Sequence, residues 1–400
     1  MKSTQRDLNR FDTIVKSFCE ITPHGTAQSI ETSFECSVPD YWSDETKAYY
    51  NKLMTQTSTD WGFFCASMPS DNSSSYSTTL TKLNAEQARL EAAFDHSFEI
   101  IPTYTHIAYG STPHRFPNNM ASETAGGNGF NGKPVLQFTY QFTTLNNSDL
   151  SGYTPMFDIL RGKYDDQFRE LAQDIKAYGK PVLFRLNNEM NTDWTSYCGI
   201  ISLLDPDVFI MTWERLYDIF LEEGVDNCIW IWNPIATSCP YSNWGEALNY
   251  LPELDYVQAL GLTYYEMNNG SSVSSFSSMY TTLYNKNMPW FDNYPWIISE
   301  FACGAGGEKL YNWGTSSYND TVLGRNQALQ AQWVKGMFKA LNDKENNAFA
   351  SHIKGAVWFS VNDYATIQGK SYITNKLSIT DDLTQTIAAF KEGFAASKEE

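Results

Sequence analysis

Eight short apolar runs recur along the chain and set its pattern. Each run is followed by a polar loop and often by an amphipathic segment. The runs are Trp61–Ala66, Phe98–Tyr104, Pro134–Tyr140, Pro181–Leu186, Cys228–Trp232, Tyr256–Leu262, Pro295–Ser299 and Ile353–Phe359. Near-continuous apolar runs of this length are typical of strands that are buried on both faces. They begin roughly 40 residues apart, which leaves room for a strand, a helix and two loops in each step.

Amphipathic segments between the runs predict helices. These segments are Leu80–Asp95, Asp165–Tyr178, Pro206–Glu223 and Thr321–Leu341. Asp205 is suited to cap the third helix, and Pro206 is suited to its first position. Strands that alternate with helices indicate a parallel sheet with right-handed crossovers.

Eight such units predict an α/β protein, a (β/α)8 TIM barrel with an N-terminal extension. A doubly wound open sheet is the competing architecture, but its glycine-rich first turn is missing from the sequence. The chain contains neither G-x-G-x-x-G nor G-x-x-x-x-G-K-[ST], so nothing indicates nucleotide binding. We divide the chain into an extension packed on the barrel, residues 1–58, and a catalytic domain, residues 59–400.

Charge and composition narrow the classes of partner. The chain has 46 acidic and 28 basic side chains, for a formal net charge of -18. Such an acidic balance argues against nucleic acid and against anionic membrane surfaces, whereas a neutral substrate meets no such repulsion. No apolar stretch is long enough for a transmembrane span. Aromatic residues reach 15%, and their flat faces suit sugar rings as well as protein cores.

Cysteine and histidine spacing give no sign of a metal site. The seven cysteines form no C-x-x-C, and the five histidines form neither H-x-H nor H-E-x-x-H. We therefore expect no metal and no cofactor. A bridge between Cys19 and Cys36 is one alternative, and buried thiols are the other.

Two glutamates follow strong apolar runs. Glu189 comes just after the fourth run, and Glu300 directly after the seventh. Active sites of these barrels lie at the C-terminal ends of the strands, so the two carboxyl groups are expected to converge there. A protonated carboxyl beside an ionised one is the arrangement that hydrolyses a glycosidic bond. We predict Glu189 and Glu300 to be catalytic; the alternative is a pair of strand-end glutamates in ordinary salt bridges.

The segment GKYDDQFRELAQDIKAYGKPVLFRLNNEMNTDW, Gly162–Trp194, resembles glycoside hydrolase family 26 around its acid/base glutamate. Val225–Pro234, Leu254–Glu266 and Pro295–Gly304 resemble the fifth, sixth and seventh strands of that family. The family belongs to a clan of retaining (β/α)8 hydrolases and consists mainly of endo-β-1,4-mannanases. The resemblance implies that Glu189 is the acid/base and Glu300 the nucleophile.

The resemblance also implies roles for residues around the two glutamates. Tyr265 matches a tyrosine that hydrogen-bonds the nucleophile, with Tyr264 as the alternative donor. Trp358 matches an aromatic floor under the sugar, and Trp194 matches a tryptophan on the leaving-group side. Arg185 matches an arginine that supports the carboxylates from behind.

Weaker expectations concern further contacts with the sugar. Trp232 ends the fifth run, and His106 follows the second; either could contact a substrate. Asn188 stands where the family commonly has histidine, and its amide can still bond a sugar hydroxyl. Thr192 replaces the usual glycine, and these departures leave the substrate open.

Taken together, these features predict a retaining endo-β-glycanase acting on β-1,4-mannan. A β-1,3-xylanase or mixed-linkage β-glucanase on the same scaffold is the first alternative, and a noncatalytic glycan-binding barrel is the second. The expected partner is a polysaccharide or oligosaccharide, and the protein is expected to be a monomer or part of a larger modular protein. A polymeric substrate predicts a secreted or cell-surface location, although the first residues show no signal peptide.

Overall fold

The structure is a computed structural model of the 400-residue chain. It describes residues 38–65, 75–109, 112–113, 115–125, 133–144, 155–199, 201–202, 204–239, 245–267, 272–291, 294–312, 317–319 and 326–398. Cys19 and Cys36, and with them the bridge considered above, lie outside the described residues.

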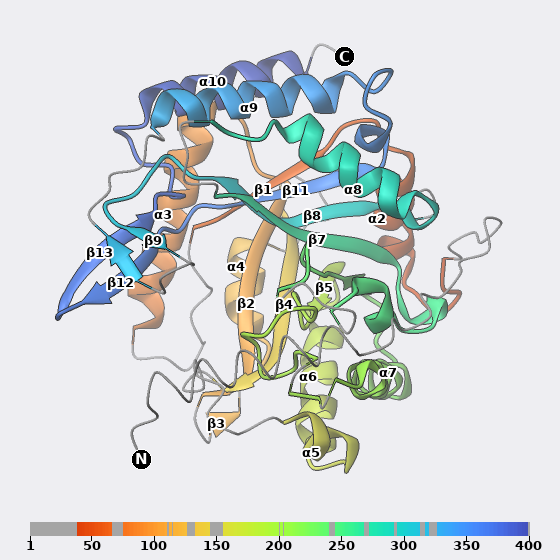
Figure 1. The fold of residues 1–400 in the computed structure, drawn as a ribbon. Helices are drawn as coiled ribbons and strands as arrows, with labels where there is room; N and C mark the ends of the chain where they lie inside the picture. Colours follow the sequence, from red (N-terminus) through yellow and green to blue (C-terminus); the bar gives the residue numbers. More distant parts are fainter. Residues whose placement is uncertain are drawn as a thin grey trace.

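Eight parallel strands close into a barrel (Figure 1). They are β1 Asp60–Phe64, β2 Ile100–Tyr109, β4 Val135–Thr144, β5 Val182–Leu186, β6 Cys228–Trp232, β7 Ala259–Glu266, β8 Trp296–Cys303 and β11 Ile353–Phe359. Each strand pairs with the next along the chain, and β1 pairs with both β11 and β2. Every predicted run corresponds to one of these strands, so the (β/α)8 prediction is confirmed.

The closing contact between β1 and β2 explains one glycine. The two strands meet at Gly62 and Ile100. A Cβ atom at position 62 would lie 2.6 Å from the carbonyl oxygen of Ile100. Because real Cβ atoms do not approach backbone so closely, any larger residue here would push the two strands apart.

Helices surround the barrel, and the four predicted ones are present. They are α2 Asp44–Thr55, α3 Tyr76–Phe94, α4 Asn118–Thr124, α5 Met156–Leu160, α6 Asp165–Tyr178, α7 Pro206–Glu222, α8 Phe276–Phe291, α9 Gln327–Asn342 and α10 Thr384–Ala396, with 3-10 turns at Ala247–Tyr250, Leu254–Tyr256 and Ala348–Ser351. The Asp205 side chain accepts a bond from the backbone N–H of Asp207, as expected of an N-cap. Helices α9 and α10 run side by side across one flank of the barrel (Figure 1).

Short strands occur in addition to the eight of the barrel: β3 Thr112–Pro113, β9 Leu310–Asn312, β10 Ser317–Asn319, β12 Asp363–Ile367 and β13 Lys370–Asn375. The β12–β13 hairpin follows β11 and projects at the left of Figure 1, whereas α2 lies on the right. No described helix is long and apolar enough to cross a membrane. Within the described residues, no group of three or more His, Cys, Asp or Glu side chains could hold a metal ion.

Helix α2 covers the N-terminal ends of the strands. Its fully buried Tyr49, Tyr50 and Leu53 pack with apolar residues of the barrel interior, among them Ile100 and Ile297. The Tyr50 hydroxyl donates to the carbonyl of Gln258 at 2.8 Å. This end of the barrel is therefore sealed by hydrophobic packing, and the division of the chain at residue 58 stays a prediction.

Candidate active site

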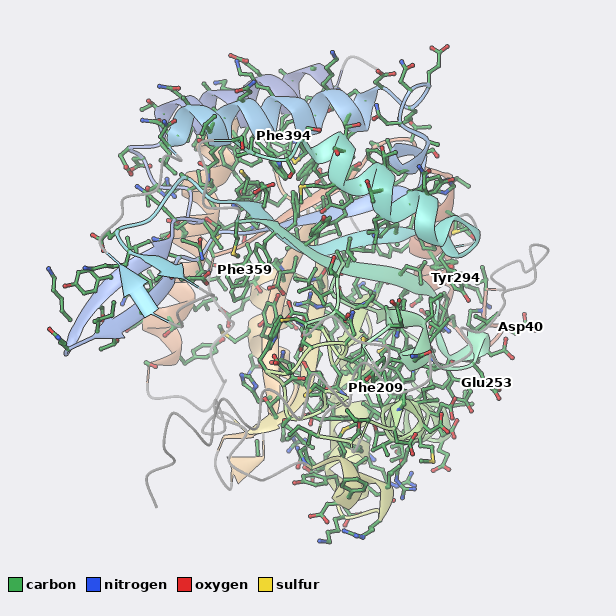
Figure 2. The ribbon with its side chains drawn as sticks, viewed as in Figure 1. Asp40, Phe209, Glu253, Tyr294, Phe359 and Phe394 are labelled. Atoms are coloured by element: carbon green, nitrogen blue, oxygen red, sulfur yellow. The ribbon has the colours of Figure 1, made fainter. Side chains whose placement is uncertain are left out.

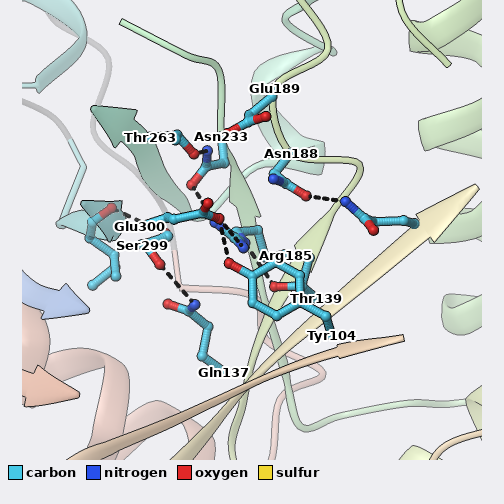
Figure 3. A network of polar contacts seen from close by, with 12 residues as sticks. Tyr104, Gln137, Thr139, Arg185, Asn188, Glu189, Asn233, Thr263, Ser299 and Glu300 are labelled. Carbon is cyan, nitrogen blue, oxygen red and sulfur yellow. Dashed lines mark hydrogen bonds and ion pairs between the residues drawn. The ribbon is translucent and has the colours of Figure 1, made fainter. Parts of the chain in front are cut away.

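Polar and charged side chains gather at the C-terminal ends of β5 and β8. Glu189 lies in the turn after β5, and Glu300 lies within β8. Strand β8 continues to Cys303, four residues beyond the end of the predicted run, so Glu300 is held on rigid strand backbone. Figure 3 shows the polar network that surrounds the two glutamates.

Three donors converge on the carboxylate of Glu300. The Tyr265 hydroxyl donates to Oε1 at 2.5 Å, and Arg185 Nη2 donates to Oε2 at 3.1 Å. The Tyr104 hydroxyl also donates to Oε2. An ionised carboxylate only accepts hydrogen bonds, so a site made of donors matches that form. Burial raises the pKa of Tyr265 and of Tyr104 well above the usual range, so both phenols keep the protons that they donate.

Arg185 is fully buried and is itself fixed on several sides. Its Nε donates to Thr139 at 2.8 Å, and its Nη1 donates to the Asn233 Oδ1 atom at 3.4 Å. The guanidinium carbon lies 4.8 Å from the centre of the Tyr104 ring. A buried cation is tolerated only when it is paired and hydrogen-bonded, and here Glu300 supplies the compensating charge.

Glu189 has a different backbone and different surroundings. Its φ angle is 61°, in the left-handed region that non-glycine residues rarely adopt, and that of Asn187 is 47°. The turn is held because the Glu189 N–H donates to the Asn233 carbonyl at 2.8 Å and Thr192 Oγ1 donates to the Glu189 carbonyl at 2.8 Å. Trp194 Nε1 donates to Glu189 Oε2 at 2.9 Å. Strain of this kind, maintained by surrounding bonds, is common where a side chain is aimed at a substrate.

The titration of Glu189 suits a proton donor. Burial and then the charge of Glu300 raise the pKa of Glu189 to about 7, while the bond from Trp194 lowers it. The effect of Glu300 on Glu189 means that the two carboxyl groups interact electrostatically across the barrel mouth. One carboxyl is thus half-protonated near neutral pH, and the other faces a cluster of donors.

Several predicted residues accompany this pair. Asn188 is buried, and its Oδ1 accepts a bond from Gln141 at 2.9 Å. Trp194 is 47% exposed beside Glu189. His106 lies two residues beyond Tyr104 in β2, on the same face, and its Nδ1 is 2.5 Å from Thr143 Oγ1. Their contacts with a substrate stay predictions.

The structure corrects the prediction for Trp358. Its side chain is fully buried on the outer face of β11, against Trp333 of α9 and Phe390 of α10, and its indole N–H donates to the Leu377 carbonyl at 3.1 Å. It therefore packs between the strand and the helices and does not face the carboxylates. The next residue, Phe359, is on the opposite face because successive strand side chains alternate.

Phe359 is the aromatic residue at the end of β11 that lies beside Tyr265. Its ring lies 6.0 Å from that of Tyr265 and is stacked at 5.0 Å on that of Phe64. Figure 2 labels Phe359 toward the β12–β13 hairpin and Phe394 beneath helices α9 and α10. The structure thus contradicts the expected orientation of Trp358, and a contact of Phe359 with substrate is untested.

Trp232 also faces away from the glutamates. It is 4% exposed, belongs to the packing between strands and helices, and donates to the Tyr250 carbonyl at 3.0 Å. Tyr264, the alternative donor to the nucleophile, packs against Tyr280 of α8 instead. The side chain that contacts Glu300 is that of Tyr265.

The sequence reasoning missed Tyr104, Thr139 and Gln141. Tyr104 closes the second apolar run, so the rule that selected strand-end residues would also have selected it. Gln141 directly follows the third run, so the same rule would have selected it as well. Thr139 lies inside that run and carries no such signal; it contacts Arg185, as Gln141 contacts Asn188. Gln137, likewise unpredicted, donates to the carbonyl of Ser299 at 3.2 Å, just before Glu300 (Figure 3).

A family model and a named relative each match part of the chain. Residues 142–290 match the family described as Glycosyl hydrolase family 26; this span includes Glu189 and ends before Glu300. Endoglucanase H of Acetivibrio thermocellus is 31% identical over 185 residues, which are 44% of this chain and 20% of that protein. The chain therefore spans about a fifth of the length of this relative.

Solved structures share the fold. The GH26 β-mannanase BoMan26A of Bacteroides ovatus matches with a TM-score of 0.59 and 12% identity, over 89% of this chain and 94% of its own. The catalytic domain of the GH26 endo-β-1,4-mannanase of Bacillus sp. JAMB-750 matches with a TM-score of 0.58 and 15% identity, over 92% of this chain and 95% of its own. At these identities the likeness shows the (β/α)8 barrel and nothing finer.

Proposed function

We propose that this chain belongs to glycoside hydrolase family 26, whose model matches residues 142–290, and that it is a retaining endo-β-glycanase in which Glu189 is the acid/base and Glu300 the nucleophile. The observation that carries the proposal is the contrast between the two carboxyl groups. Glu300 faces three donors, whereas the pKa of Glu189 is raised to about 7 by burial and by Glu300. Retaining hydrolysis needs this division, because one carboxyl must attack while the other delivers a proton.

The proposed reaction proceeds in two displacements. In the first, Glu300 attacks the anomeric carbon as the glycosidic C–O bond breaks, and Glu189 gives its proton to the departing oxygen. In the second, the ionised Glu189 takes a proton from a water molecule whose oxygen attacks the same carbon. Glu300 leaves as a carboxylate, and Glu189 is protonated again.

The donors to Glu300 have a defined part in this scheme. Tyr265, Tyr104 and Arg185 hold both oxygens of the carboxylate in place before the substrate arrives. Preorganised donors need no rearrangement at the moment of reaction, which is why they are effective in catalysis. Asn233 connects the two glutamates, since its carbonyl receives the Glu189 N–H and its side chain contacts Arg185.

The first candidate substrate is β-1,4-mannan, as the sequence predicts. A second candidate, mixed-linkage or other β-glucan, is favoured by a specific observation: the similar protein from A. thermocellus is named an endoglucanase. Asn188, which replaces the usual histidine beside the acid/base, also points away from the common mannanase pattern. We further propose that the protein is secreted or displayed at the cell surface, alone or as one part of a modular protein.

The proposal is tested by the release of reducing sugar from β-mannan, mixed-linkage β-glucan and β-1,3-xylan. We expect the wild type to hydrolyse at least one glycan, and Glu300→Ala to lower kcat by about 10⁴-fold or more. Glu345→Ala is the matched control, because Glu345 is exposed on the loop after α9. Binding of a glycan without release by the wild type would favour the noncatalytic alternative. Activity retained in Glu300→Ala would exclude Glu300 as the nucleophile.

A further inference from the structure

Trp194 has two surfaces that serve different purposes. One edge of its indole carries the N–H that donates to Glu189 Oε2 at 2.9 Å. The rest of the ring contributes to an exposed fraction of 47%, high for a tryptophan so close to a buried network. Trp194 is five residues from Glu189 in the same turn, so the ring and the carboxyl group are close in sequence as well as in space.

We propose that the indole N–H of Trp194 positions the Glu189 carboxyl and couples its protonation to the presence of a sugar on the exposed ring. The inference rests on the proposed function of the site. It goes beyond the expected stacking of a leaving-group sugar on Trp194. It makes Trp194 a positioning residue for the proton transfer.

The neighbouring groups show why Trp194 is suited to this coupling. Glu189 is faced by Glu300 from β8, Arg185 from β5, Tyr265 from β7 and Tyr197 from its own loop. These four are buried or largely buried and are held by other partners. Trp194 is much more exposed than these four groups, so a bound sugar would change its surroundings the most.

The coupling follows from solvation. A sugar that covers the exposed ring would remove water from Glu189, and loss of water favours the neutral, protonated carboxyl. This is the form that protonates the departing oxygen. When that sugar leaves, water returns, and the N–H donor stabilises the ionised carboxylate that must activate water in the second displacement.

The matched test replaces only the N–H. Trp194→Phe keeps an aromatic face but has no donor, whereas Trp194→Ala removes both. The titration of Glu189 is followed by ¹³C NMR in protein labelled at glutamate carboxyl carbons, with Glu189→Gln identifying the signal. We expect the midpoint to rise by about 0.5–1 pH unit in Trp194→Phe, because a donor to the ionised form is lost. Tyr41→Phe, a change at another exposed aromatic residue, serves as a control with no shift.

The second part of the test adds a disaccharide. Cellobiose or mannobiose at saturating concentration should raise the titration midpoint of Glu189 in the wild type above its value without sugar. In Trp194→Ala the disaccharide should leave the midpoint unchanged. An unchanged midpoint in Trp194→Phe would show that the N–H has no effect on the carboxyl and would overturn the proposal. An equal response to disaccharide in the wild type and in Trp194→Ala would overturn the coupling.

Kinetics then separate this inference from the proposed function. If a glycan is hydrolysed, the alkaline pKa of the kcat/KM profile should be about 0.5–1 pH unit higher in Trp194→Phe than in the wild type. If Trp194 served only as a platform for the sugar, the substitution would change KM alone. If no glycan is hydrolysed by the wild type, the proposed function fails, while the NMR titration still decides the role of the indole N–H.

Discussion

The surroundings of Glu300 and of Glu189 differ in backbone, in donors and in exposure. Glu300 lies on a strand and meets two phenols and a guanidinium. Glu189 lies in a turn with positive φ and meets the indole N–H of Trp194 and the side chain of Thr263. The two residues are chemically identical, so their different roles must come from these surroundings.

The difference teaches that a barrel can separate an acid from a nucleophile by the placement of donors. Arg185 contacts Glu300 directly, but its effect on Glu189 is weaker than that of burial and of Glu300. The negative charge of Glu300 is thus held by its own donors and still raises the pKa of Glu189. Each carboxyl helps to set the state of the other, as in other catalytic pairs.

A large effect, second to that of Glu300→Ala, is expected from removing the proton of Glu189. Glu189→Gln should lower kcat/KM on a polysaccharide by about 10²–10⁴-fold, because the departing sugar oxygen needs general acid catalysis. With a substrate whose leaving group is a stabilised phenolate, the loss in the first displacement should be much smaller. The alkaline limb of the pH profile should disappear for that substrate. Equal losses on both substrates, or an unchanged alkaline limb, would assign the acid elsewhere.

A smaller effect is expected from removing one donor to Glu300. Tyr265→Phe should lower kcat by about 10- to 100-fold, the cost of one hydrogen bond to a charged group. Tyr264→Phe is the matched control, because Tyr264 is adjacent in sequence but packs on Tyr280. Steady-state kinetics on the same glycan compare the two variants. Similar rates for both would mean that the donors around Glu300 do not matter for its reactivity.

A further effect is on stability, and it depends on pH. The pKa of Glu189 is about 7 in the folded protein and has its ordinary, lower value in the unfolded chain. Between these values the folded state binds more protons, so this group contributes stability at low pH that is lost as the pH rises through 7. Glu189→Gln lacks this titration, and its stability relative to the wild type should increase by about 3 kcal/mol between pH 4.5 and pH 8.

Urea unfolding at the two pH values measures this difference. Glu345→Gln, at an exposed position, is the control and should follow the wild type at both values. If Glu189→Gln is no more stable relative to the wild type at pH 8 than at pH 4.5, the folded protein does not raise the pKa of Glu189.

The sequence predicts the fold and the two glutamates for the same physical reason. Strands buried on both faces leave long apolar runs, and the residues just beyond them reach the barrel mouth. The spacing of the runs then places Glu189 and Glu300 at the same end without any knowledge of their contacts. The resemblance of Gly162–Trp194 added Arg185, and that of Leu254–Glu266 added Tyr265. The structure puts both side chains in contact with Glu300.

What the sequence could not predict depends on single-residue register. Trp358 and Phe359 are adjacent, and a strand places them on opposite faces, so an error of one residue exchanges core and site. Strand β8 continues from Glu300 to Cys303, where its backbone pairs with that of β7, and an apolar run that ends at a charged residue does not reveal this pairing. The network of Thr139, Asn233 and Gln141 depends on distances between strands far apart in sequence.

The central claim is that Glu300 attacks the sugar directly and that Glu189 acts twice. The most direct test is ¹H NMR of the anomeric proton in the product formed during the first minutes of hydrolysis, before mutarotation. The account predicts that the β anomer appears first, because two displacements at the same carbon retain its configuration. If the α anomer appears first, a single displacement by water has occurred, Glu300 is a base and not a nucleophile, and the account is wrong.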